Sequence, residues 1–334
     1  MARLLTLLTG AAVLWLLYWL AAGWGLRSGI TAWFAAQEAR GWQAEFADAG
    51  TAGFPARHIT RLDNPVLADP ATGAAWRADW LTVSSPAIWP GRQTLTFPDS
   101  PQRYSYFDRT AVLTAQEMGA DLTLAPGTAL ELSALALTAG PWALNTPGHQ
   151  AAAADTLILS MTQTDDGSAS YRIAAAAQGF APGAQLRRLV AASGLLPETF
   201  ERLMLKLEVT FDRPWDRRAL ESRRPQPRAL SVDELDIHWG SLRLRAAGDL
   251  TVDTAGVPTG TLALKAENWR SLLTMAEQSG RLSRDARRGA ERVLGLLAGL
   301  GGNPEDLETQ LNIRDGWVAL GPLPLGPAPS LVLR

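Results

Sequence analysis

The sequence has no cysteine, which excludes disulfide bridges, thiolate metal sites and thiol nucleophiles. Its three histidines, His58, His149 and His238, are far apart in the sequence, and no two of them have the short spacing that is typical of metal ligands. The 31 basic residues are balanced by 33 acidic residues, so the basic excess typical of nucleic-acid-binding proteins is missing. We therefore predict no bound metal, no cofactor and no nucleic-acid partner.

Catalytic motifs are also missing. The sequence contains no phosphate-binding glycine loop that opens a helix and no G-x-S-x-G nucleophile turn. We therefore predict that the protein is not an enzyme, with no catalytic residue. One alternative is a hydrolase in which His58 works with nearby carboxylates, namely Asp63, Asp69 and Asp79. The competing interpretation is that these aspartates only stabilise turns, because aspartate beside proline and glycine is typical of turns.

One long apolar run is present, at the N-terminus. Residues 4–22 carry no charge, and as a helix they would reach roughly 28 Å, close to the thickness of the hydrocarbon core. Arg3 favours a cytoplasmic N-terminus, and an aromatic belt closes the run (Trp15, Tyr18, Trp19 and Trp24). We predict a transmembrane anchor over residues 1–26, with the rest of the chain on the far side of the membrane. A cleaved signal peptide is the alternative, because residues 20–23 (LAAG) suit cleavage.

The rest of the sequence predicts a mainly β fold. Residues 27–45 have the pattern of a juxtamembrane helix, and from Phe46 the apolar period becomes two. We expect one elongated domain over residues 46–334, with residues 212–228 as the candidate for a subdomain boundary. Expected strands are 57–63, 74–83, 93–97, 103–107, 110–117, 120–125, 129–138, 155–163, 169–177, 203–211, a three-stranded meander over 230–267, and 306–313 and 316–320. Expected helices are 182–192, 268–278 and 282–300.

In the later strands apolar and polar residues alternate strictly. This pattern predicts an open, curved antiparallel sheet with one apolar face, covered in part by these helices. The uncovered part of that face would form a lipid groove, and we expect four leucines to line it: Leu205, Leu207, Leu244 and Leu264. Trp76 and Trp80 have the same parity on the expected strand 74–83, so they should share one face.

An arginine cluster is the main polar feature. Five arginines are candidates for contact with a lipid headgroup or an acidic partner: Arg213, Arg217, Arg218, Arg223 and Arg224. Three acidic residues, Asp212, Asp216 and Glu221, are mixed among them, which favours the alternative of a solvated loop with internal ion pairs.

Four stretches together carry a family resemblance: GWQAEFADAGTAGFPARHITRLDNPVLADPATGAAW (41–76), FDRPWDRRALESRRPQPRAL (211–230), GDLTVDTAGVPTGTLALKAENWR (248–270) and WVALGPLPLGPAPSLVL (317–333). The chain resembles a bacterial membrane-anchored family known as domain-of-unknown-function family 2125. This resemblance implies a single-pass anchor in the bacterial inner membrane, with the bulk of the chain in the periplasm. The chain is more distantly similar to AsmA-like envelope proteins, through the pattern G-x-L-x-x-D-x-x-G-x-P-x-G-x-L at residues 248–262 and the closing GPLPL (321–325). That second resemblance implies one N-terminal membrane helix, a long curved sheet and movement of lipid along it.

Besides the hydrolase around His58, two functions stay open. The first is binding or transport of lipid along the apolar sheet face, with the membrane and a lipid as partners. The second is a scaffolding role, in which a sheet edge or the proline-rich tail binds another envelope protein.

Overall fold

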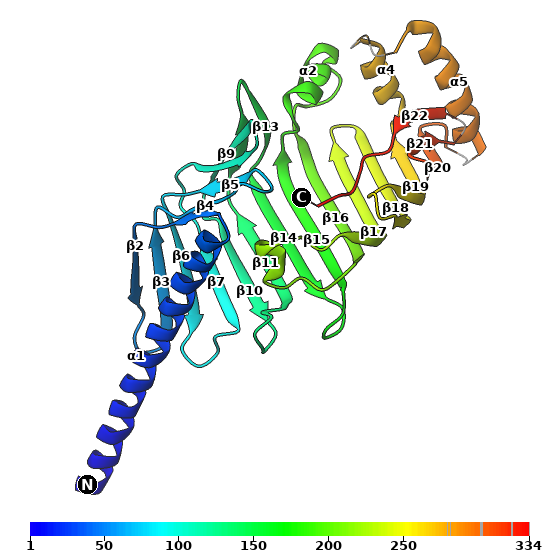
Figure 1. Ribbon diagram of the computed structural model, residues 1–334. Helices are drawn as coiled ribbons and strands as arrows, with labels where there is room; N and C mark the ends of the chain where they lie inside the picture. The colour runs from blue at the N-terminus through cyan, green and yellow to red at the C-terminus, as the bar shows by residue number, and fades with distance from the viewer. Residues whose placement is uncertain (279, 281, 301–302, 322, 334) are drawn as a thin grey trace.

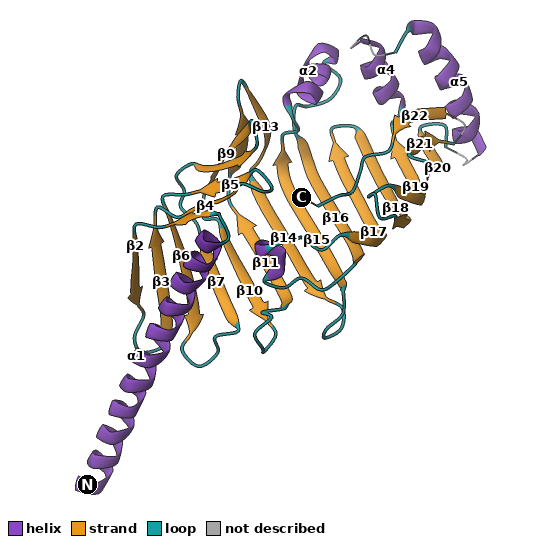
Figure 2. Cartoon of the chain, in the orientation of Figure 1, coloured by secondary structure: helices purple, strands orange, loops and turns teal. Residues whose placement is uncertain are grey.

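The structure, a computed structural model, describes residues 1–278, 280, 282–300, 303–321 and 323–333. Within them the chain forms a long N-terminal helix, two antiparallel sheets and four shorter helices (Figure 1, Figure 2). The large sheet is open and coils across most of the molecule, so the predicted mainly β class is confirmed.

The N-terminal helix α1 runs without interruption over Ala2–Ala39, and it is long and apolar enough to cross a membrane. The predicted juxtamembrane helix is too long, because α1 ends at Ala39 instead of residue 45. Gly41 takes a φ of +90°, in the left-handed region that favours glycine, and so ends the helical path. Residues Gln43–Glu45 then form strand β1, which pairs with β4.

The large sheet contains fifteen strands of the described chain, in the order β2 (Asp48–Ala52), β3 (Arg57–Asp63), β6 (Trp80–Pro86), β7 (Arg92–Thr96), β10 (Gly119–Leu124), β11 (Leu132–Ala139), β14 (Thr156–Gln163), β15 (Ser170–Phe180), β16 (Phe200–Phe211), β17 (Pro227–Trp239), β18 (Leu242–Val252), β19 (Pro258–Glu267), β20 (Asp306–Arg314), β21 (Trp317–Leu320) and β22 (Leu323–Pro327). From β14 onward every strand pairs with its neighbour in sequence. β16 and β17 therefore pair directly, and residues 212–226 are an excursion from one continuous sheet.

The small sheet has seven strands, in the order β1, β4 (Val66–Asp69), β5 (Ala74–Arg77), β8 (Gln102–Tyr106), β9 (Arg109–Ala115), β12 (Trp142–Thr146) and β13 (His149–Ala154). Up to β13, consecutive strand pairs alternate between the two sheets. The small sheet lies across one end of the strands of the large one (Figure 2).

The prediction of a single strand over 74–83 is wrong. Residues 74–77 belong to the small sheet and residues 80–86 to the large one, so Trp76 and Trp80 do not share a face. The chain changes sheets at Ala78 and Asp79, where Ala78 N–H donates to the carbonyl of Pro65. Counting odd and even positions along the sequence cannot reveal such a change of sheet, because the residues on both sides of it remain extended.

The helices α2 (Ala184–Ser193), α4 (Arg270–Gln278) and α5 (Arg284–Leu300) lie together at the end of the molecule far from the N-terminus (Figure 1). Their positions agree with the three predicted helices to within two residues. The short helix α3 (Arg218–Glu221) lies within the 212–226 excursion.

Glycine is required where strands β18 and β19 approach each other. Gly248 has a φ of +147°, and a Cβ there would lie 2.3 Å from the carbonyl oxygen of Thr261. We predict that Gly248→Ala costs roughly 1–3 kcal/mol of folding free energy. The measurement is the melting temperature by circular dichroism. Gly50→Ala in β2 is the control, since nothing lies within 4 Å of its Cβ position, and an equal loss in both variants would contradict the argument.

Candidate functional site

One face of the large sheet is apolar from β6 to β19. Residues that face one another across antiparallel strands point to the same side, so the registers identify this face directly. One row of such partners crosses the sheet from β6 to β19 with one residue from each strand: Val83, Leu95, Ala120, Leu137, Leu159, Ala175, Leu205, Leu235, Ala246 and Leu264. We call these residues the central row. They give the sheet a continuous apolar path.

The four predicted groove leucines lie on this face. Leu205 and Leu264 belong to the central row, and Leu244 faces Ile237 beside it. All three are half-buried, whereas Leu207 is buried against Phe211 and its neighbours. The structure therefore brings the four together, and it leaves three of them partly accessible.

A bulge in β17 keeps this face apolar. Val232 faces Gly248, but the next partners along the strand are Leu235 and Ala246, so β17 carries one extra residue there. The extra residue returns Leu235 to the side of Val232, and exposed Asp233 remains in solvent.

Several segments pack on the apolar face and leave its centre half-buried. α1 covers β2 and β3 through a cluster with Phe34 and Leu62, and Trp215 of the excursion covers the cluster around Tyr171. The helices α2 and α4 cover Trp239, and α5 covers Leu307. The half-buried side chains between these covers include Leu159, Ala175, Leu203, Leu205, Leu235, Leu262 and Leu264.

A cavity of about 400 Å³ lies between the small sheet, the end of α1 and the excursion. Five aromatic residues line it: Trp33, Trp42, Trp76, Tyr104 and Tyr106. The excursion contributes Leu220 and Arg224. Burial raises the pKa of Tyr104, and its hydroxyl donates to Gln102 Oε1 at 3.4 Å. The sequence did not predict this cavity, because its lining comes from five separate segments.

Acidic neighbours hold most of the five arginines. Arg218 pairs with Asp216 at 2.6 Å, Arg223 pairs with Asp212, and Arg217 lies 3.8 Å from Glu221. Burial raises the pKa of Asp216, but the hydrogen bonds from Arg218 outweigh it and hold that pKa below the usual value.

The other two arginines differ from these three. Arg213 donates to the backbone carbonyl of Arg223. Arg224 has no hydrogen bond or ion pair from its guanidinium to any described residue, and it lines the cavity. Among the five, Arg224 is thus the cation most open to an anionic ligand.

Glu221 ties the excursion to α1. Its carboxylate accepts a hydrogen bond from Trp33 Nε1 at 3.1 Å and lies 3.6 Å from Arg40 Nη1. The excursion therefore carries both this contact with α1 and, three residues further on, Arg224 at the cavity.

The structure does not assemble a carboxylate–histidine site. His58 is 2% exposed and stacks on Trp19, and neither ring nitrogen has a hydrogen-bond partner in the described chain. The three candidate carboxylates have other partners. Asp63 pairs with Arg61, Asp69 accepts from Thr72, and Asp79 accepts from Ser100.

The buried imidazole predicts a pH-dependent stability, because burial lowers the pKa of His58. The unfolded chain then binds the proton more tightly than the folded one. Stability is full above the unfolded pKa of about 6.5 and falls as pH drops below it. We expect the full chain in detergent to melt at a lower temperature at about pH 5.5 than at about pH 7.5.

His58→Phe should reduce this pH difference in melting temperature, whereas His149→Phe, at an exposed histidine, should keep it. An unchanged difference in His58→Phe would show that other groups cause it.

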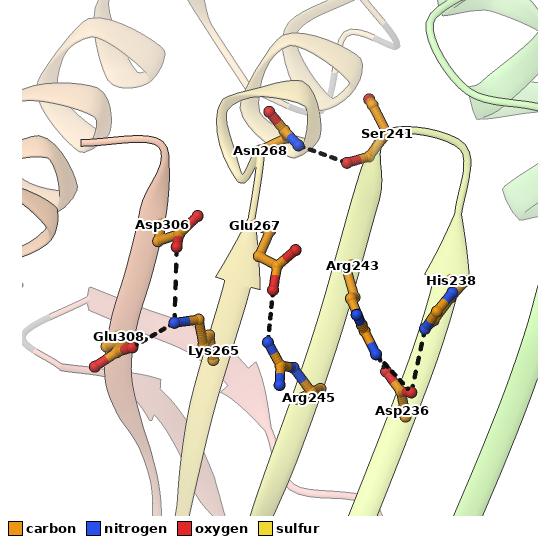
Figure 3. A network of polar contacts seen from close by, with 10 residues as sticks. All are labelled: Asp236, His238, Ser241, Arg243, Arg245, Lys265, Glu267, Asn268, Asp306 and Glu308. Carbon is orange, nitrogen blue, oxygen red and sulfur yellow. Dashed lines mark hydrogen bonds and ion pairs between the residues drawn. The ribbon is translucent and has the colours of Figure 1, made fainter. Parts of the chain in front are cut away.

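The opposite face of the large sheet carries cross-strand ion pairs (Figure 3). Asp236 accepts hydrogen bonds from Arg243 and His238, and Arg245 pairs with Glu267 at 2.6 Å. Burial raises the pKa of Asp236, yet its hydrogen bonds from Arg243 outweigh that effect and hold its pKa below the usual value. The described residues contain no group of three His, Asp or Glu placed to hold a metal ion. We interpret this face as a solvated surface whose ion pairs fix strand register.

The fold and the site define a class: a large open antiparallel sheet with one continuous apolar face, led by a single apolar helix that is compatible with membrane anchoring. Residues 19–329 match the family described as "Uncharacterized protein conserved in bacteria (DUF2125)", and the chain belongs to that family. The family resemblance found in the sequence is therefore confirmed. No curated protein matches the chain.

Proposed function

We propose that this protein is anchored in the bacterial inner membrane by α1 and binds the acyl chains of a lipid on the apolar face, on the periplasmic side. One observation carries the proposal, namely the central row, which runs across the sheet and stays half-buried at its middle. Lipid tails are the ligand that a long, uncharged and shallow surface suits, because burial of its leucines stabilises binding without any specific polar partner.

Two further features support this proposal. Arg224 presents a guanidinium that has no partner among the described residues, and it lies beside the aromatic cavity, where it would bind the phosphate of a headgroup. Arg3 stands before the apolar helix, which favours keeping the N-terminus in the cytoplasm. The predicted similarity to AsmA-like proteins, which stays a prediction, points to the same function.

The scaffolding alternative receives less support. The outermost strand of the large sheet at its C-terminal end, β22, contains Pro324 and Pro327. Proline has no N–H to donate, so this edge is a poor site for an added strand.

The test uses the full chain in nanodiscs, because α1 packs on the domain and its removal would expose buried residues. The probe is a phosphatidylglycerol with a photoactivatable diazirine at the end of one acyl chain. We expect peptides from β16–β19 to be labelled after illumination. Labelling restricted to α1 would overturn lipid binding, since α1 alone would then contact lipid.

A further inference from the structure

The uncharged part of α1 that lies beyond the domain is too short to span a bilayer. It follows the charged Arg3, and residues 4–14 are exposed along their whole length and protrude from the domain (Figure 1). As a helix these positions reach roughly 17 Å, whereas a hydrocarbon core is about 30 Å thick. An uncharged span that follows Arg3 therefore has to include about another nine residues, up to about residue 23.

Three of those additional residues of α1 form hydrogen bonds with the domain. Trp15 Nε1 donates to the carbonyl of Pro55 at 3.2 Å, and Tyr18 Oη donates to the carbonyl of Ala87 at 2.8 Å. Trp19 Nε1 donates to the carbonyl of Arg57 at 2.9 Å. These three hydrogen bonds fix the β2–β3 loop and the β6–β7 loop at the depth of residues 15–19.

The two loops have the composition of a membrane-inserted surface. Residues 53–56 (GFPA) and 86–91 (PAIWPG) carry no charge. Their large side chains point into solvent, with Phe54 52%, Ile88 69% and Trp89 64% exposed. Arg57 and Arg92 follow the loops directly. Arg57 Nε donates to Ser84 Oγ at 2.9 Å, whereas the stem of Arg92 can extend along apolar surface while its charged end reaches the headgroups.

We infer that residues 53–56 and 86–91 insert into the periplasmic leaflet of the membrane. The edge of the large sheet beside α1 then lies at the surface of the bilayer. This inference rests on the proposed anchoring. It also gives the apolar face an entrance. Val83 of the central row lies on β6, whose end continues into the inserted loop, so an acyl chain can pass from the leaflet onto the sheet.

The absence of cysteine makes a depth measurement direct. Full-length single-cysteine variants carry a nitroxide label in vesicles of phosphatidylethanolamine and phosphatidylglycerol, and collisions with oxygen and with a water-soluble nickel chelate are compared. The test position is Ile88→Cys. Leu14→Cys on α1 is the reference for the hydrocarbon, and Ile158→Cys on β14, also exposed, is the reference for water.

We expect the ratio of oxygen to nickel collisions at Ile88 to be several-fold higher than at Ile158 and close to that at Leu14. A ratio at Ile88 equal to that at Ile158 would overturn the insertion. Protection of Ile88 from both reagents would also overturn it, because it would indicate a protein partner at these loops. A nickel-accessible label at Leu14 would instead contradict the anchoring itself, and with it the proposed function.

Discussion

Leu264→Glu should reduce acyl-chain labelling of β16–β19 by at least about tenfold. Leu264 lies in the central row, between Ala246 and Thr309, and it is half-buried. A carboxylate placed there has to lose water when a lipid tail covers it, and desolvating an uncompensated charge costs several kcal/mol. Because 1.4 kcal/mol corresponds to a factor of ten in affinity, even partial desolvation suffices. The measurement is the labelled fraction of peptides from these strands in nanodiscs.

A matched control is available at the preceding residue. Ala263→Glu places the same charge on the same strand, but residue 263 is exposed and points to the opposite face of the sheet. Its labelling should equal that of the unmodified chain. Leu264→Gln, without the charge, should give an intermediate loss. Equal labelling in Leu264→Glu and Ala263→Glu would show that the apolar face is not the binding surface.

The apolar face was predictable because its strands are long and strictly alternating. In β16, apolar Leu205 and Leu207 are separated by charged Lys206, so parity alone assigns the face. The registers then confirm that the strands from 200 to 267 align their apolar sides. Leu207 shows the limit of that reasoning, since burial under Trp215 comes from a segment that the alternation does not describe.

The small sheet was not predictable in the same way. Its strand β4 has four residues, and β13 reads HQAAAA, in which alanine gives no contrast between the two faces. The aromatic cavity was harder still. Trp33 comes from α1 and Trp76 from β5, and only the tertiary fold brings them together with Arg224. The unusual density of tryptophan was the available signal, but it could not indicate which of these rings would meet.

Trp269→Ala should be the most destabilising single change considered, at about 3–5 kcal/mol. The indole of Trp269 is 2% exposed and packs with Ala266, Leu294 and Leu307, at the junction of β19, α4 and α5. Its Nε1 also donates to the carbonyl of Pro304. Removing the ring therefore leaves a cavity beneath the two helices, although the carbonyl of Pro304 keeps its hydrogen bond from Arg270 Nη1. The covering of this end of the apolar face should loosen.

The measurement is denaturant unfolding followed by circular dichroism, together with amide hydrogen exchange of α4 and α5. Trp317→Ala is the control, because Trp317 on β21 is 59% exposed and the same truncation there should cost under about 1 kcal/mol. Faster exchange in α4 and α5 is expected only in the first variant. If both variants lose the same stability, then packing at Trp269 does not hold these helices on the sheet. The helices would then have to depend on other contacts, such as the ion pairs of Arg270 with Glu291 and Glu305.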